Sequence, residues 1–340
     1  MLLARHVHTA RLRLRPLSPA DVPAIVSALS GFETARWLGR VPHPYRLSDA
    51  QEFVARSQDK QVWAIEDGAG FAGMIGMVGE LGYWLAPHAR GKGYIQEAAL
   101  HLVACHFADP QVDHLKAGYF IGNHASARIL YGLGFVEDGP ADRRPSVAWA
   151  DLRPHQPLRL DRAGWARRFV PQIRTPRLRI DPLRPEDDVA FHRLVTCPSI
   201  GRMLQRFPAD WTLPQARAFL AEARWQGARP CRLALRHQGR FVGSIGVGQG
   251  ACPAIFYFLD PAEAGRGLMS EALEGFIGWL SETWGLRQLT ARVFCDNPAS
   301  RHVLEKAGFR VTGTGSGTSA QRAAPAPDWG LDYEAPDPAA

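Results

Sequence analysis

The sequence lacks the cysteine spacing of a zinc site or of a redox motif. Its five cysteines are scattered and include no CxxC pair, and an odd, dispersed set is typical of reduced thiols in a cytoplasmic protein. Long apolar runs are also absent. The run at 98–104 contains a histidine and falls far short of the ~20 residues that span a bilayer. No apolar signal-peptide core follows the first residue. We therefore expect a cytoplasmic protein without a membrane partner.

Long blocks of like charge and paired metal-binding histidines are missing as well. The formal net charge is +7, but the excess arginines are spread along the chain, so we expect no nucleic-acid partner. No HExxH pairing occurs among the 12 histidines, and we expect no metal. The positive balance is compatible with an anionic ligand, although net charge by itself does not indicate one.

An internal repeat is the dominant feature of the chain. Thr9-Ala-Arg-Leu-Arg-Leu recurs as Thr175-Pro-Arg-Leu-Arg-Ile, an offset of 175 − 9 = 166 residues. The offset grows to 170 for the segment that begins at Phe71, and to 174 from Trp84 to Phe135. Because the offset changes only in steps that a loop insertion would produce, the sequence predicts a duplicated domain. We expect domains at 1–168 and 169–340, with a loose Ala/Pro-rich tail from about 323.

Within one copy, strand and helix patterns alternate. We predict strands at 12–16, 61–66, 71–78, 82–85 and 115–121, and helices at 22–29, 48–56, 95–107 and 125–133. Asp67-Gly68 marks the turn of a hairpin. The expected fold class is therefore α/β, with a mixed, mostly antiparallel sheet flanked by helices in each domain.

A glycine pair between a strand and a helix is the strongest candidate for ligand binding. Gly91 and Gly93 allow the backbone to approach a ligand, and the first helical turn presents free N–H groups that favour an anion such as a pyrophosphate. The alternative is a tight turn only. The 68–73 segment matches GxGxxG, but a strand follows it instead of a helix, so we interpret it as a hairpin.

In combination, these segments resemble the GNAT superfamily of N-acetyltransferases, and within it the branch that acetylates ribosomal-protein N-termini. The resemblance rests on 9–16, on Gly82-Tyr-Trp-Leu85, on Arg90-Gly-Lys-Gly-Tyr-Ile-Gln-Glu-Ala98, and on Asn123-His-Ala-Ser126 through Leu133-Gly-Phe135. It implies acetyl-CoA as co-substrate, without a metal, and an amine acceptor that is a protein N-terminus or a small molecule. The implied cofactor-binding residues are Trp84, Leu85, Arg90, Gly91, Lys92, Gly93, Tyr94, Ile95 and Asn123, with Leu259, Gly265, Arg266, Gly267 and Asn297 in the second copy.

Three side chains are candidates for the chemistry that the resemblance implies. Tyr131 would protonate the leaving thiolate, and Ser126 is a substitute donor. Glu80 would deprotonate the amine, directly or through water. Each also has a purely structural reading: a half-buried aromatic, an N-terminal helix residue and a turn residue. Asn123 could equally be a helix cap.

The second copy departs from the pattern at three of these positions. It has Glu305 in place of Tyr131, Ala264 in place of Arg90 and Ala254 in place of Glu80. We therefore expect acetyl transfer by direct attack in a ternary complex, mainly in the first copy, and a monomer in which the second copy substitutes for a partner subunit. The alternative is a non-catalytic acyl-CoA-binding or sensing protein. Acceptor specificity is expected from 30–45 and 199–211, whose residues do not identify the amine.

Overall fold

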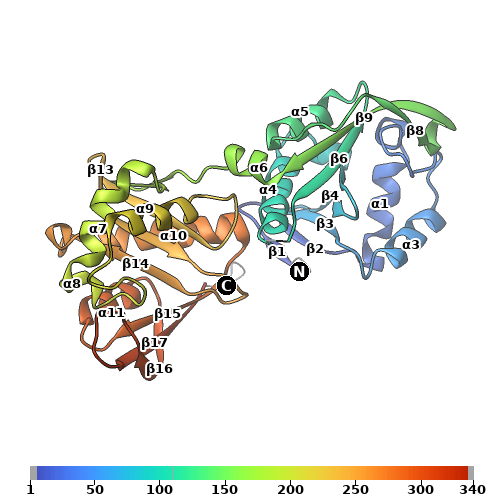
Figure 1. The fold of residues 1–340 in the computed structure, drawn as a ribbon. Helices are drawn as coiled ribbons and strands as arrows, with labels where there is room; N and C mark the ends of the chain where they lie inside the picture. Colours follow the sequence, from blue (N-terminus) through green and yellow to red (C-terminus); the bar gives the residue numbers. More distant parts are fainter. Residues whose placement is uncertain (1–5, 110, 336–340) are drawn as a thin grey trace. The chain divides into compact units, whose positions relative to one another are not determined.

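The computed structural model describes residues 6–109 and 111–335. The chain divides into two compact units, one built from Met1–Arg168 and the other from Phe169 onward except for Glu282–Gly285. Each unit contains sheet strands flanked by helices (Figure 1). The predicted α/β class with mixed, mostly antiparallel sheets is confirmed.

The first unit is organised around one sheet with the order β1-β2-β3-β4-β5-β6-β9-β7, and β8 pairs with β9. All its pairings are antiparallel except the one between β5 and β6. The strands are β1 (Val7–His8), β2 (Arg13–Pro16), β3 (Val62–Asp67), β4 (Gly70–Met77), β5 (Leu81–Leu85), β6 (His114–Phe120), β7 (Val136–Glu137), β8 (Asp142–Ser146) and β9 (Asp151–Asp161). The GxGxxG segment forms the β3–β4 hairpin, as predicted.

The α-helices in the described part of this unit are α1 (Val22–Leu29), α2 (Phe32–Ala35), α3 (Leu47–Arg56), α4 (Tyr94–Phe107), α5 (His124–Leu133) and α6 (Arg162–Arg168). The apolar positions of α1 and α3 recur at helical spacing, so Ile25, Leu29 and Val54 share a core with Ala64 and Trp84 of the sheet. At roughly 25 cal/mol per Å² of buried apolar surface, this core is a main source of stability.

The second unit repeats the arrangement with its strands in two sheets. One sheet has the order β10-β11-β12-β13-β14, and the other β15-β17-β16. The strands are β10 (Ile173–Arg174), β11 (Leu178–Pro182), β12 (Cys231–His237), β13 (Arg240–Val247), β14 (Ile255–Leu259), β15 (Gln288–Phe294), β16 (Arg310–Gly317) and β17 (Ala326–Glu334), and the helices are α7 (Asp188–Thr196), α8 (Pro198–Gly201), α9 (Leu213–Glu222), α10 (Leu268–Trp284) and α11 (Pro298–Lys306).

The expectation of a loose tail from about 323 is wrong. Strand β17 pairs along its length with both β15 and β16, and it buries Asp328 and Leu331. The strand is stabilised by its two neighbouring backbones, and so it forms although its own residues include proline, glycine and acidic side chains. Residues 336–340 lie outside the described part. In the first unit, β8, β9 and α6 likewise extend the ordered fold beyond the last helix that the pattern predicted.

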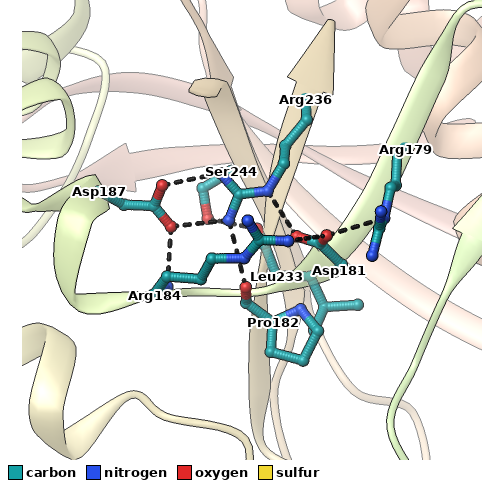
Figure 2. Close-up of polar contacts among 8 residues, drawn as sticks. All are labelled: Arg179, Asp181, Pro182, Arg184, Asp187, Leu233, Arg236 and Ser244. Carbon is teal, nitrogen blue, oxygen red and sulfur yellow. Dashed lines mark hydrogen bonds and ion pairs between the residues drawn. The ribbon is translucent and has the colours of Figure 1, made fainter. Parts of the chain in front are cut away.

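An ion cluster, buried in the second unit and partly buried in the first, ties the first strands of each unit to the turn that follows, and the two charges on the strands are exchanged between the copies. In the second unit, Arg236 is hydrogen-bonded to Asp181 at 2.6 Å and to Asp187 at 2.8 and 2.9 Å (Figure 2). In the first unit, the positions of Asp181 and Arg236 hold Arg15 and Glu66. The charges are exchanged and the contact is kept: Arg15 bonds Glu66 at 2.7 Å and Asp21 at 2.6 and 2.8 Å. Both clusters leave each buried charge with a partner, which a low-dielectric interior requires.

Candidate functional site

Two parallel strands separate in the middle of the first unit. β5 and β6 pair only at Leu81 and Ala117, whereas β5 pairs with β4 along its whole length. Beyond Leu81, one edge of β5 therefore carries backbone groups that no strand of the described chain pairs with. This opening between β5 and β6 is called the splay below.

The Leu85 N–H points into the splay. A side chain at Gly73 of β4 would begin 2.3 Å from the Trp84 carbonyl oxygen, so that carbonyl faces β4. The peptide is planar and trans, and the Leu85 N–H of the same peptide therefore points the opposite way. A backbone donor fixed in this manner could bond a carbonyl oxygen on which negative charge develops.

The glycine loop follows β5 and opens helix α4, which begins at Tyr94. Gly91 and Gly93 have φ of 75° and 78°, a region that favours glycine. No atom lies within 4 Å of the position that a Cβ on Gly91 would take, so the loop has open space beside it. The first-turn N–H groups and the positive end of the α4 dipole make this space suitable for an anion.

A side-chain clamp holds the glycine loop against the first strands. Glu97 of α4 accepts hydrogen bonds from the Thr9 hydroxyl at 2.6 Å, from the Arg11 N–H at 2.9 Å and from Arg11 Nε at 2.7 Å. Arg11 Nη1 donates to the Lys92 carbonyl at 3.0 Å. Burial alone would raise the pKa of Glu97, but the bonds from Thr9 and Arg11 outweigh it and lower that pKa.

The charged and aromatic residues of the loop contact other elements of the unit. Arg90 donates to the Thr34 hydroxyl of α2 at 2.5 Å. The Tyr94 hydroxyl donates to Asp67 at 3.0 Å, and Lys92 Nζ lies 3.9 Å from the same carboxylate. The loop is thus attached both to α2 and to the β3–β4 turn.

A pair of hydroxyls bridges β5 and α5. The Tyr83 and Ser126 hydroxyl oxygens are 3.0 Å apart, and burial raises the pKa of Tyr83 to about 12. The Asn123 side chain caps α5 by accepting from the Ser126 N–H at 3.2 Å. The structure therefore shows the helix-cap role of Asn123, and it brings Ser126 to the strand that borders the splay.

Tyr131 and Glu80 lie apart from this hydroxyl pair. The Tyr131 hydroxyl is 3.4 Å from Tyr119 of β6 and 3.4 Å from Glu137 of β7, and the hydrogen bond with Tyr119, more than other influences, raises the pKa of Tyr131. Its ring is 42% exposed. Glu80 is half exposed at the turn before β5 and is 3.5 Å from Arg144 Nη1. The roles suggested for these two residues stay predictions.

The second unit reproduces most of the site. A single parallel bridge joins Ala254, the residue before β14, to Thr290 of β15. The Phe258 carbonyl faces Gly243, so the Leu259 N–H is directed like that of Leu85. Gly265 and Gly267 both have φ of 74°. The remaining equivalents are the Arg177–Glu271 clamp, the Tyr257–Ser300 hydroxyl pair and the Asn297 cap.

The charge around the second glycine loop is different. Glu263 is buried in the turn before the loop and pairs with Arg266, with Arg240 at 3.3 Å and with His237 at 3.2 Å. The first unit has Ala89 at the place of Glu263. Glu305, at the place of Tyr131, pairs with Arg301 at 2.7 Å. Each loop thus has a carboxylate beside it, Asp67 in the first unit and Glu263 in the second, but the first loop carries two cationic side chains, Arg90 and Lys92, where the second carries Arg266 alone.

Comparison with known proteins identifies the two copies. The model of the family described as "Acetyltransferase (GNAT) domain" matches residues 11–136 and again residues 177–310. The chain belongs to the GNAT acetyltransferase family. Two of its relatives are from Bacillus subtilis: the uncharacterized N-acetyltransferase YoaA is 29% identical over 39% of this chain and 84% of its own length, and the putative ribosomal N-acetyltransferase YdaF is 24% identical over 38% and 80%.

Solved GNAT structures also align with about half of the chain. RimJ of Mycobacterium smegmatis, in complex with CoA-disulfide, is 21% identical and covers 49% of this chain and 87% of its own, with a TM-score of 0.43. A GNAT-family acetyltransferase from Bacillus anthracis is 19% identical and covers 48% and 98%, also with a TM-score of 0.43. Within 6–109 and 111–335 of this GNAT protein, no helix is long and apolar enough to cross a membrane, and no group of three His, Cys, Asp or Glu residues could hold a metal.

Sequence reasoning missed two features of this GNAT site: the Tyr83–Ser126 pair and the clamp formed by Thr9, Arg11 and Glu97. A signal for both was available in the repeat, because Tyr257, Ser300, Thr175, Arg177 and Glu271 occupy the equivalent positions. Residues that recur in both copies and that meet only in the folded unit are candidates for such contacts.

Proposed function

We propose that this GNAT protein transfers an acetyl group from acetyl-CoA to a primary amine by direct attack in a ternary complex, and that the first unit performs the catalysis. The observation that carries the proposal is the combination, within one unit, of a backbone N–H directed into the splay and an open glycine loop at a helix N-terminus. The acceptor would be a protein N-terminus or a small-molecule amine, as the putative ribosomal activity of YdaF suggests.

In the proposed reaction, the amine nitrogen forms a bond to the acetyl carbon as the carbon–sulfur bond breaks, and the sulfur leaves as a thiolate. The Leu85 N–H would stabilise the charge on the thioester oxygen. The loop from Arg90 to Ile95 would hold the pyrophosphate through backbone N–H groups, with Lys92 adding positive charge.

Two protons have to move in this reaction. Ser126 would protonate the leaving thiolate, because its hydroxyl lies on the first turn of α5 and bonds Tyr83 of β5. Tyr131 is the alternative donor. The amine would lose its proton to Glu80 or to water, and an α-amine, with an ordinary pKa of about 7.7–8.0, needs less help than a lysine.

The charges of the two loops support catalysis in the first unit and a non-catalytic role for the second. The first loop carries two cationic side chains, Arg90 and Lys92, whereas the second carries Arg266 and has Ala264 at the place of Arg90. The second unit would then be a non-catalytic acyl-CoA-binding or structural copy. We also propose a domain boundary at 168/169 and a monomeric, cytoplasmic protein in which the repeat replaces a homodimer.

Calorimetric titration of acetyl-CoA into the intact protein tests this proposal. Gly91→Trp and Gly265→Trp are matched variants, because both glycines have nearly the same positive φ and no atoms within 4 Å of a Cβ. We expect Gly91→Trp to abolish binding at the catalytic site and the release of CoA, and Gly265→Trp to leave the release of CoA intact. Absence of binding by well-folded wild-type protein would refute the acetyltransferase assignment. Loss of turnover in the Gly265→Trp variant alone would assign catalysis to the second unit.

A further inference from the structure

A small cavity lies in the first unit near the end of β6. Its volume is about 190 Å³, and it is lined by Arg36, Trp37, Phe120, Ile121, Trp149 and Arg153. This is smaller than the roughly 300–1,000 Å³ of a typical ligand pocket, so it suits one side chain or functional group and not a whole cofactor. Helix α2, which Arg36 of the cavity follows, also contacts the glycine loop, because Thr34 of that helix accepts a hydrogen bond from Arg90.

Two guanidinium groups lie over two indole rings in this cavity. Arg36 is 4.5 Å from the centre of the Trp37 ring, and Arg153 is 4.5 Å from that of Trp149. The Arg36 Nε atom is buried and has no hydrogen-bond partner. The one carboxylate within ion-pair distance of these arginines, in the described chain, is that of the largely exposed Glu33, 3.2 Å from Arg36 Nη1. The cavity therefore holds more positive than negative charge and an unsatisfied donor.

In the second unit, the arginine at the place of Arg36 is paired with a carboxylate. Arg202 follows α8 as Arg36 follows α2, and Phe294 occupies the place of Phe120. A cavity of about 480 Å³ is lined there by Arg202 and Arg322, among others. Asp296 accepts from Arg322 at 2.7 and 2.9 Å and from Arg202 at 3.1 Å.

The residue that supplies this carboxylate is absent from the first unit. The place of Asp296 is held there by Gly122, next to the same asparagine cap. A Cβ on Gly122 would lie 3.4 Å from the Trp37 ring. The arginine that follows the short helix is therefore paired with Asp296 in the second copy, whereas in the first copy Gly122, at the same position, supplies no carboxylate to Arg36. An arginine pair of this kind binds a carboxylate well, because guanidinium donors match carboxylate oxygens in geometry and charge.

We propose that the cavity of the first unit binds a carboxylate carried by the acceptor, so that the preferred acceptor is an amine with an acidic group close by. The proposal rests on the acetyl-transfer function proposed above. The bond between Arg202 and Asp296 in the second unit indicates how such a carboxylate would pair with Arg36, and Arg153 lines the same cavity. The second unit, with its internal carboxylate, would not select an acidic acceptor.

Two peptides that differ in one residue test the proposal without any variant. Acetylation of Ala-Glu and Ala-Gln peptides of otherwise identical sequence is followed by the release of CoA. We expect the wild-type protein to favour the Ala-Glu peptide about 10-fold in kcat/KM, mainly through KM, since hydrogen bonds to charged groups are the strong ones. Equal rates for the two peptides would overturn the proposal and leave the acetyltransferase function standing. Absence of turnover with both peptides, together with absence of acetyl-CoA binding, would remove the function on which it rests.

Variants then assign the preference to the cavity. Arg153→Gln should reduce the ratio of the two kcat/KM values to near one, and Arg153→Lys should restore part of it. Arg202→Gln, the control in the second unit, should leave the ratio unchanged. A ratio that depends on Arg202 and not on Arg153 would refute the assignment. A peptide with phosphoserine in place of glutamate separates a carboxylate site from a general anion site, and a clear preference for the phosphopeptide would contradict the carboxylate assignment.

Discussion

Replacement of Arg236 by methionine should strongly destabilise the second unit. The guanidinium is 6% exposed, and its partners Asp181 and Asp187 are 2% and 3% exposed. Without Arg236, Asp181 keeps Arg179 at 2.9 Å and Arg184 at 2.8 Å. Within the described residues, Asp187 keeps the Arg184 backbone N–H at 2.8 Å as its one donor. The cost is therefore mainly that of one buried, poorly paired carboxylate.

Removal of one partner from a buried ion pair costs about 3–5 kcal/mol, and we expect a loss of about 3 kcal/mol because Asp187 retains one donor. The first unit suggests a second substitution that would restore the ion pair. There Arg15 and Glu66 occupy the places of Asp181 and Arg236. The double variant Asp181→Arg with Arg236→Glu should therefore be more stable than the sum of its single changes by about 2 kcal/mol, within the usual range for residues in contact.

Hydrogen exchange of β11 and β12 amides, measured by mass spectrometry, is the suitable assay, because the tandem chain need not unfold in one step. Exchange in the first-unit strands is the internal control. A loss below about 1 kcal/mol for Arg236→Met, the value of an ordinary hydrogen bond, would refute the argument that the cluster is a buried, interdependent set. A double variant whose loss of stability equals the sum of the two single losses would also refute this argument.

Three further predictions concern the site and the first unit. Glu97→Gln should weaken acetyl-CoA binding by about 10-fold by loosening the glycine loop, as measured by calorimetry, whereas Glu271→Gln should leave turnover unchanged. Ser126→Ala should lower kcat by about 10²-fold if its hydroxyl is the proton donor; a larger loss in Tyr131→Phe would assign that role to Tyr131. Burial alone would raise the pKa of Asp21, but its bonds with Arg15 and Ser18 lower it. The stability that Asp21 contributes should be complete above about pH 4, near the ordinary Asp pKa, and should be lost as the pH falls toward the lowered pKa. Protection of the β2 amides against hydrogen exchange, relative to the intrinsic rate at each pH, should fall with it; protection that stays constant through this range would contradict the prediction.

Much of the fold could be predicted because the relevant signals are local. The helix at 22–29 was predicted at its observed bounds, and the hairpin at Asp67-Gly68 follows from its turn residues. Strand β17 could not be predicted in this manner. Its formation depends on β15 and β16, which lie elsewhere in the sequence, and its composition resembles that of a loop.

The candidate site was predictable only in part for the same reason. Gly91 and Gly93 are marked in the sequence because their backbone conformation requires glycine. The hydroxyl pair joins residues 43 positions apart, and the clamp joins Arg11 to Glu97 across 86 positions. Spacing within a single copy gives no indication of such contacts.

The sequence alone determined that the chain contains two copies of one domain, and that each copy has a glycine pair between a strand and a helix. It also carried the resemblance to the GNAT superfamily, which the family match confirmed. These properties depend on local conformational preferences and on repeated patterns, both of which can be read along a chain. Only the tertiary structure showed which backbone N–H faces the splay, which arginines have carboxylate partners, and that Asp296 pairs with Arg202 in one copy whereas Gly122, at the same position in the other copy, supplies no carboxylate to Arg36. Electrostatic pairing is decided by distance in space, and distance in space is set by the packing of the whole unit.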